Sequence, residues 1–93
     1  MSAYFIANIR IYKPDEFDKY LEKVDLVLKK FNGKYLCVDS NPERIEGKWD
    51  YSRLVLLEFQ DKKSLKEWYN SKEYQEILKL RLSSAECDTI IVG

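Results

Sequence analysis

The chain has 93 residues, 45% of them hydrophobic and 14% aromatic, and its 16 basic and 16 acidic side chains cancel. This length supports one hydrophobic core, so we expect a single domain over residues 1–93. Neither sign of charge collects into a long block, and no apolar run approaches the roughly 20 residues of a bilayer span. We therefore expect a folded, soluble protein that binds neither nucleic acid nor membrane.

The first residues of the chain and its two cysteines indicate the cellular compartment in which we expect the protein. The sequence Met-Ser-Ala-Tyr begins without a basic segment followed by an apolar run, so we expect a cytoplasmic protein. Cys37 and Cys87 have neither the spacing of metal ligands nor that of a disulfide framework. Two buried, inert thiols and no metal site are expected.

Residues 3–11 alternate as a strand does, with a purely apolar side and a mixed side. The mixed side predicts contact with a partner or a cavity rather than with open water, and it carries Tyr4, Ile6, Asn8 and Arg10.

A helix is predicted to begin at Pro14, because proline suits the first turn and the following carboxylates favour the positive end of the helix dipole. An apolar stripe at helical spacing continues it and consists of Phe17, Tyr20, Leu21, Val24, Leu28 and Phe31. Gly33 is expected to supply the left-handed residue that ends this helix.

Residues 34–39 are predicted to form a second strand, and a loop marked by Asn41-Pro42 and Gly47 leads to a third over residues 53–59. The third strand is apolar on both faces, which is typical of a central strand covered on both sides.

Asp61 is expected to cap a second helix, and Asn70 followed by Glu73 to cap a restart or kink in it. The helix contains Leu65, Trp68 and Tyr69, and the restarted segment continues the helical spacing to Leu82. Residues 89–92 are predicted to close the chain as a fourth strand.

This order predicts an α+β, ferredoxin-like β-α-β-β-α-β fold with a four-stranded antiparallel sheet. Right-handed crossovers place the first and third strands in the middle. The helices can cover only one face of such a sheet, although the third strand is apolar on both. We therefore expect a homodimer through the sheet faces, with a ligand or a partner domain as the alternative cover.

The sequence contains no histidine, which removes the commonest general base and the usual axial ligand of haem. Its three glycines stand apart, so no glycine-rich phosphate loop is present. We expect no cofactor.

A polar set stands inside apolar surroundings, where charges need partners, and it consists of Asn8, Arg10, Arg53, Glu58 and Arg81. One interpretation is structural: Glu58 pairs with an arginine, and the set fixes strand register or dimer geometry. The other is functional: Glu58 is a buried acid or base, and an arginine meets an anionic or enolic ligand. Both remain open at this point.

Trp68, Tyr69 and Tyr74 recur at helical spacing, which is typical of a core, although their polar tips also suit the orientation of a ligand. Trp49, in the loop, fits either a lid over a pocket or the cover of an edge strand.

The chain resembles the family called domain of unknown function 1330 over nearly its whole length. The similarity is densest at Glu46-Gly47-Lys48-Trp49, and its other pieces are Ala3-Tyr4, Gly33-Lys34-Tyr35-Leu36, Arg53, Leu57-Glu58-Phe59, Trp68-Tyr69-Asn70-Ser71, Tyr74 and Arg81. The resemblance implies a dimeric α+β barrel.

Two departures stand out. Val38 lies where the family often has an arginine, which implies a lost anion contact, and Asn32 replaces the first glycine of a common pair. The family has no agreed reaction. Its wider superfamily includes cofactor-free monooxygenases, lactone isomerases and haem-handling enzymes, and the lack of histidine argues against the haem branch.

Together these features predict a homodimer that binds or transforms a small apolar or aromatic acidic metabolite in a pocket on the sheet face. Both an enzyme and a binding protein fit. Glu58 and Arg53 are the candidate catalytic residues, and the candidate ligand-binding residues are Glu46, Trp68, Tyr69, Tyr74 and Arg81. The alternative is a non-catalytic dimerisation or ligand-binding module in which the polar set is structural.

Overall fold

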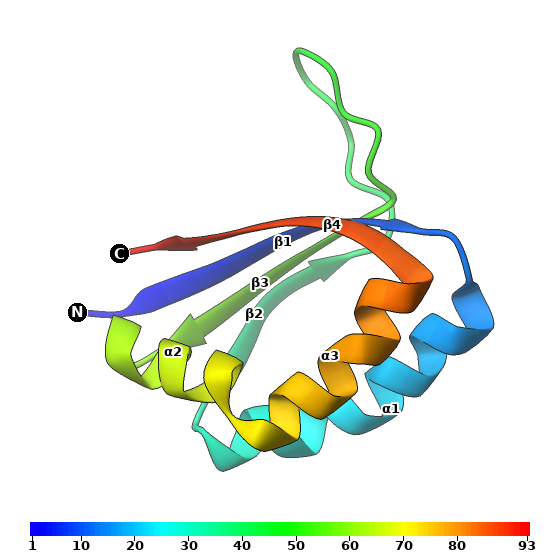
Figure 1. Cartoon of the computed structure of the whole chain (residues 1–93). Helices are drawn as coiled ribbons and strands as arrows, with labels where there is room; N and C mark the ends of the chain where they lie inside the picture. The colour runs from blue at the N-terminus through cyan, green and yellow to red at the C-terminus, as the bar shows by residue number, and fades with distance from the viewer.

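The computed structural model describes residues 1–93, which form a four-stranded antiparallel sheet with the helices on one face (Figure 1). The elements in chain order are β1 (Ala3–Ile11), α1 (Pro14–Lys30), β2 (Lys34–Asp39), β3 (Arg53–Phe59), α2 (Lys62–Asn70), α3 (Lys72–Ser84) and β4 (Ala85–Val92). The strand order β2-β3-β1-β4 places β1 and β3 in the middle. The predicted fold class is confirmed, with the second helix divided into α2 and α3.

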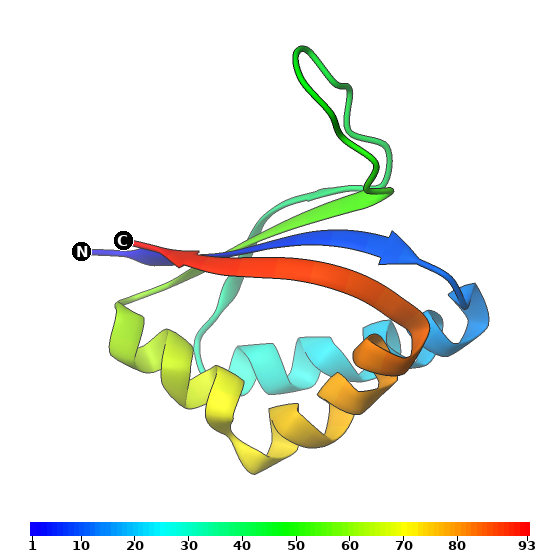
Figure 2. The same ribbon diagram turned by 45° about the horizontal axis from the view of Figure 1, so that its top comes forward.

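Strand register decides which side chains share a face of the sheet. β1 pairs with β3 so that Phe5 stands opposite Leu57 and Tyr4 opposite Glu58. Successive strand residues point to opposite faces. Phe5, Leu57 and Arg53 therefore point towards the helices, whereas Tyr4 and Glu58 lie on the face that no helix covers (Figure 2). We call this second face the open face.

One cluster of 15 buried hydrophobic residues fills the space between the sheet and the helices. Trp68 lies at its centre and is fully buried. Its ring centroid is 5.3 Å from that of Phe5, 5.2 Å from that of Phe59 and 4.1 Å from that of Tyr74. The prediction that Trp68 and Tyr74 are core residues is confirmed.

The open face carries apolar side chains with nothing over them. By register it presents Tyr4, Ile6, Leu54, Leu56, Ile90 and Val92. Ile90 is 58% exposed and Val92 44% exposed. The chain's own helices thus leave the second apolar face of β3 uncovered, as the sequence predicted.

Several expectations about the ends of elements were wrong. Asn32 (φ 60°), not Gly33, is the left-handed residue after α1, because asparagine tolerates this conformation. Ser71, not Asn70, caps α3, since its hydroxyl accepts a hydrogen bond from the Tyr74 N–H at 3.1 Å. β4 begins at Ala85, whose backbone is already extended, so α3 runs into the strand without a loop.

The two thiols also differ from the expectation. Cys37 is exposed because β2 is an edge strand in which every residue is exposed, whereas Cys87 is partly buried on β4. All three helices fall short of the length and apolar character that a membrane span requires.

Gly33 is needed for close packing rather than for its backbone conformation. A Cβ atom at this position would lie 2.4 Å from Cδ1 of Leu28 and 2.7 Å from Cζ of Phe59. Carbon atoms pack best at about 3.5–4.0 Å. We expect Gly33→Ala to lower the free energy of unfolding by about 1–3 kcal/mol, measured by urea denaturation.

A compensating change tests the reason for this loss. Leu28→Val removes the Cδ1 atom that the new Cβ would meet. The double variant should therefore lose less than the sum of the two single losses. Simple additivity would contradict a steric clash with Leu28 and leave Phe59 as the obstructing side chain.

Candidate functional site

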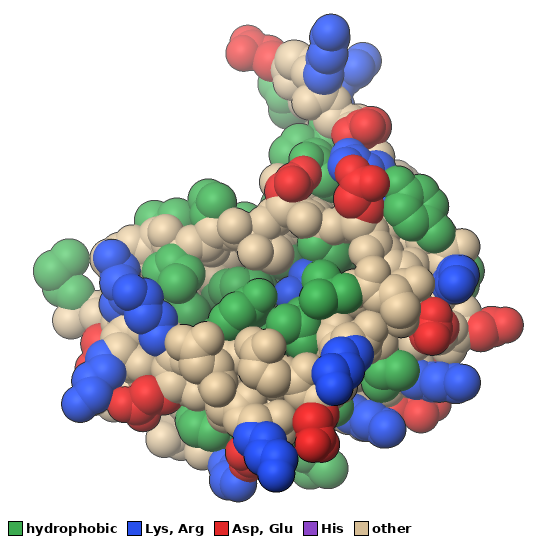
Figure 3. Space-filling view, in the orientation of Figure 1, with side chains coloured by type: hydrophobic (Ala, Val, Ile, Leu, Met, Phe, Trp, Pro, Cys, Tyr) green, Lys and Arg blue, Asp and Glu red, His purple; other side chains and the backbone are tan.

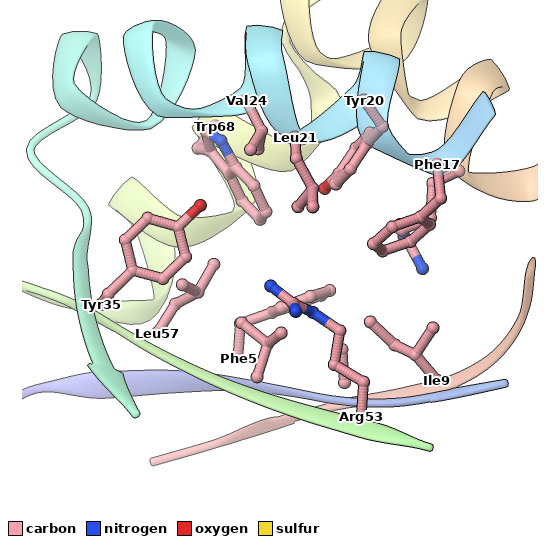
Figure 4. A pocket seen from close by; sticks show the side chains of 13 residues that line it. Phe5, Ile9, Phe17, Tyr20, Leu21, Val24, Tyr35, Arg53, Leu57 and Trp68 are labelled. Atoms are coloured by element: carbon pink, nitrogen blue, oxygen red, sulfur yellow. The ribbon is translucent and has the colours of Figure 1, made fainter. Parts of the chain in front are cut away.

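A small cavity lies between the helix-facing side of the sheet and α1 (Figure 4). Its volume of about 30 Å³ gives room for roughly two water molecules. Eleven of the 13 lining residues are hydrophobic, and the other two are Arg53 and Arg81. The cavity is thus an apolar space that meets two positive charges.

The cavity opens between β2 and α1. Its lining residues from β1, α2 and α3 are buried, whereas Leu21 on α1 and Arg53 on β3 are partly exposed and Tyr35 on β2 is 41% exposed. The Tyr35 hydroxyl donates a hydrogen bond to the Asp25 carboxylate of α1 at 2.8 Å. In Figure 3 the surface between the sheet and the helices is hollowed, and hydrophobic side chains surround a basic one there.

Arg53 reaches into the cavity from the first residue of β3 (Figure 4). Its Nη1 donates to Oγ of Ser40 at 3.2 Å, and its guanidinium carbon lies 5.8 Å from the centroid of the Phe17 ring. Its Nε is buried without a hydrogen-bond partner. Because the side chain is partly exposed, Arg53 can move towards solvent without leaving a core position.

Arg81 is the more deeply buried of the two arginines, with only 3% of its surface exposed. It belongs to none of the ion pairs, which join Arg10 to Asp50 and Glu86, and Lys30 to Glu73. Its Nε is also buried without a partner. A buried charge without a counter-charge is costly to a folded protein.

The neighbours of Arg81 do not neutralise it. They are the Tyr20 ring, whose centroid lies 5.9 Å from the guanidinium carbon, the Tyr74 hydroxyl and the Cys87 thiol. Burial raises the pKa of Tyr20 well above its ordinary value and also raises the pKa of Tyr74. Both phenols are therefore neutral at neutral pH.

The two phenols form a hydrogen bond with each other, with the oxygens 2.7 Å apart. This bond uses one of their two hydroxyl protons, and the Tyr74 hydroxyl also lies beside the Arg81 guanidinium. When Tyr74 is the donor, the Tyr20 proton is free beside the cavity that Tyr20 lines. The site then offers a guanidinium and an O–H donor, which suit an oxygen anion.

Three of the predicted site residues meet at this cavity, namely Arg53, Trp68 and Arg81. Tyr74 stands behind it, in contact with Tyr20 through the hydroxyl pair. Tyr69 lies outside and lines a shallow hollow beside β4.

The two predicted carboxylates lie away from the cavity. Glu46 belongs to the segment that joins β2 to β3 and lines a surface hollow with Trp49. Glu58 lies on the open face, opposite Lys34 of β2, and forms no ion pair. Within the protomer Glu58 therefore does not pair with an arginine, as one of the two interpretations of the polar set had suggested.

Arg53 and Glu58 cannot act on one group within a protomer. They are five residues apart on the same strand, so their side chains point to opposite faces of the sheet. The sequence also left Tyr20 and Tyr35 out of the candidate site, although both line the cavity. The sequence did contain one indication for Tyr20, because its hydroxyl is a polar group within the apolar stripe of α1.

Several solved structures share the fold at low sequence identity. A dimeric ferredoxin-like protein of unknown function from Jannaschia sp. has a TM-score of 0.81 at 11% identity, covering 100% of this chain and 99% of that one. A protein of unknown function from Rhodopseudomonas palustris has a TM-score of 0.77 at 16% identity, covering 98% and 80%. SnoaB, a cofactor-independent oxygenase from Streptomyces nogalater, has a TM-score of 0.74 at 11% identity, covering 99% and 91%.

At these identities the likeness concerns the fold alone, and no curated protein matches the sequence. The family described as Domain of unknown function (DUF1330) matches residues 2–93. The chain therefore belongs to the DUF1330 family.

Proposed function

We propose that the protein is a homodimer in which each protomer binds a small organic anion, a carboxylate with an apolar or aromatic body, in the cavity beside α1. The observation that carries the proposal is Arg81, a buried guanidinium with no counter-charge in the protein. A bound carboxylate would supply that charge. Guanidinium and carboxylate groups match each other in shape and hydrogen bonding.

The rest of the lining supports the same ligand class. The apolar walls suit a hydrocarbon or aromatic body, and the Tyr20 hydroxyl suits a carboxylate oxygen. The volume of about 30 Å³ fits only a very small anion as the side chains stand. A larger acid requires Tyr35 and Arg53 to move outward, and neither is buried.

The homodimer is supported by the open face, whose apolar side chains remain in contact with solvent in the protomer. A second copy is the simplest cover for such a face. The similar Jannaschia protein is described as dimeric.

Binding, rather than proton transfer, is the activity that the lining residues support. No carboxylate, histidine or thiol lines the cavity. Burial raises the pKa values of Tyr20 and Tyr35, so neither phenol serves as a base near neutral pH. The rival hypothesis is that Arg81 is purely structural and that the protein is an interaction module without a ligand.

Calorimetric titration of the dimer with formate, acetate and benzoate, in a chloride-free buffer, tests the proposal. We expect saturable binding of at least one of these carboxylates, at one site per protomer. Benzamide, which keeps the ring of benzoate but lacks its charge, should not bind. If no carboxylate binds, or if benzamide binds as well as benzoate, the anion proposal is wrong.

A control variant separates the site from general attraction between charges. Lys79→Met removes an exposed basic side chain of α3 outside the cavity. It should leave carboxylate binding unchanged.

A further inference from the structure

Residues 40–52 form an arm that joins β2 to β3 and rises from the sheet on the side opposite the helices (Figures 1 and 2). The chain runs out and back, in limbs of about six residues. Extended limbs of this length reach roughly 20 Å at about 3.3 Å per residue. The arm therefore stands far above the open face.

Contacts with the central and outer strands fix the base of the arm. Arg10 on β1 donates to Asp50 at 2.8 Å, and its guanidinium lies 4.5 Å from the centroid of the Tyr51 ring. The Tyr51 hydroxyl donates to Asp88 on β4, and the Ser52 N–H donates to the Ile9 carbonyl at 2.9 Å. The direction of the arm is thus set before any partner binds.

The outer part of the arm has no such support within the protomer. No backbone group of residues 42–51 takes part in a backbone hydrogen bond. Ile45 is 82% exposed. The ring of Trp49 packs against that of Tyr51 at 5.1 Å between centroids, and its Nε1 is buried without a partner. Unpaired backbone groups and an exposed apolar tip are features of a segment that contacts another surface.

We propose that the arm is a docking element that packs against a second copy of this chain bound at the open face. The inference rests on the homodimer proposed above. Facing sheets pack about 10 Å apart, so an arm of roughly twice that length has to run along the partner rather than between the sheets. Two arms related by a two-fold axis would clasp the dimer from both sides.

The charges of the arm suit contact with a second copy of this chain better than contact with a partner whose surface carries charge of one sign. Residues 43–48 alternate between acidic and basic side chains, namely Glu43, Arg44, Glu46 and Lys48. The whole chain has a net charge of zero. A two-fold contact between such surfaces can pair opposite charges without a net repulsion.

Tryptophan fluorescence during dilution tests the arm, with sedimentation velocity reporting the mass. Trp68 is buried in the protomer core, whereas Trp49 lies at the arm. We expect the emission of the wild-type protein to shift to longer wavelength as the dimer dissociates. The Trp49→Phe variant should dissociate without this shift.

The outcomes separate the two proposals. Dissociation of the wild-type dimer with no change in emission would overturn the docking role of the arm and leave the homodimer standing. A monomer at every concentration would overturn both.

A pair of substitutions supplies a second readout. Ile45→Ser should weaken the dimer by at least about tenfold in Kd, since burial of an isoleucine side chain is lost. Leu26→Ser is the matched control, because Leu26 is 76% exposed on α1, on the far side of the sheet from the arm. An equal effect of the two substitutions would contradict the proposal.

Discussion

Replacement of Arg81 by methionine is expected to stabilise the free protein and to remove its carboxylate binding. Methionine keeps much of the length of the side chain but carries no charge that must be buried. Replacing buried ionic groups by apolar ones of similar size often raises the free energy of unfolding, by about 1–4 kcal/mol. Loss of a hydrogen bond to a charged group corresponds to a roughly 10- to 150-fold loss of affinity.

Urea denaturation and calorimetric titration with the best-bound carboxylate measure the two effects. Lys79→Met, at an exposed position of the same helix, is the control and should alter neither quantity appreciably. A destabilised Arg81→Met protein that still binds the carboxylate would favour the structural interpretation of this arginine. The two expected effects have opposite signs, because the free energy of unfolding rises while carboxylate binding is lost. Replacement of a residue kept for packing alone would not produce both effects.

Replacement of Trp68 by alanine is expected to lower the free energy of unfolding by about 3–5 kcal/mol. Trp68 has no exposed surface and packs against the rings of Phe5, Phe59 and Tyr74. Domains of this size have total stabilities of about 5–15 kcal/mol, so the variant should be close to unfolding.

Urea denaturation followed by circular dichroism measures this loss. Trp68→Phe retains part of the ring packing and should lose distinctly less. A loss below about 1 kcal/mol in Trp68→Ala would show that the surrounding rings close the space, contrary to the expectation for a rigid aromatic core.

The parts of the fold that follow from side-chain spacing could be predicted from the sequence. Alternation along residues 3–11 identified the helix-facing side of β1, and the stripe from Phe17 to Leu28 identified the buried side of α1. The apolar faces of β3 indicated its central position. These patterns are local, and the strand and helix periods alone decide them.

The sequence did not show which of two suitable neighbouring residues ends a helix or caps the next one. Asn32 and Gly33 both suit a left-handed conformation, and the packing of Leu28 and Phe59 against Gly33 leaves that position without room for a side chain. Asn70 and Ser71 are both capping residues. Which one caps α3 depends on where α2 ends.

The candidate site was predicted in part. Arg81 stood out as a charge inside an apolar stripe, and the cavity confirms its apolar surroundings. The opposite orientations of Arg53 and Glu58 follow from strand alternation, which the sequence does contain. That Arg81 has no carboxylate nearby depends on the packing of α3 against α1, and no local pattern encodes it.

The phenol pair and the missing histidine together give the cavity a constant charge. Tyr20 and Tyr74 stay protonated because burial raises their pKa values, and arginine remains cationic throughout the ordinary pH range. The arginines and phenols that line the cavity therefore keep one charge state between about pH 5 and 9. Within that interval they would bring no pH dependence of their own to the proposed carboxylate binding.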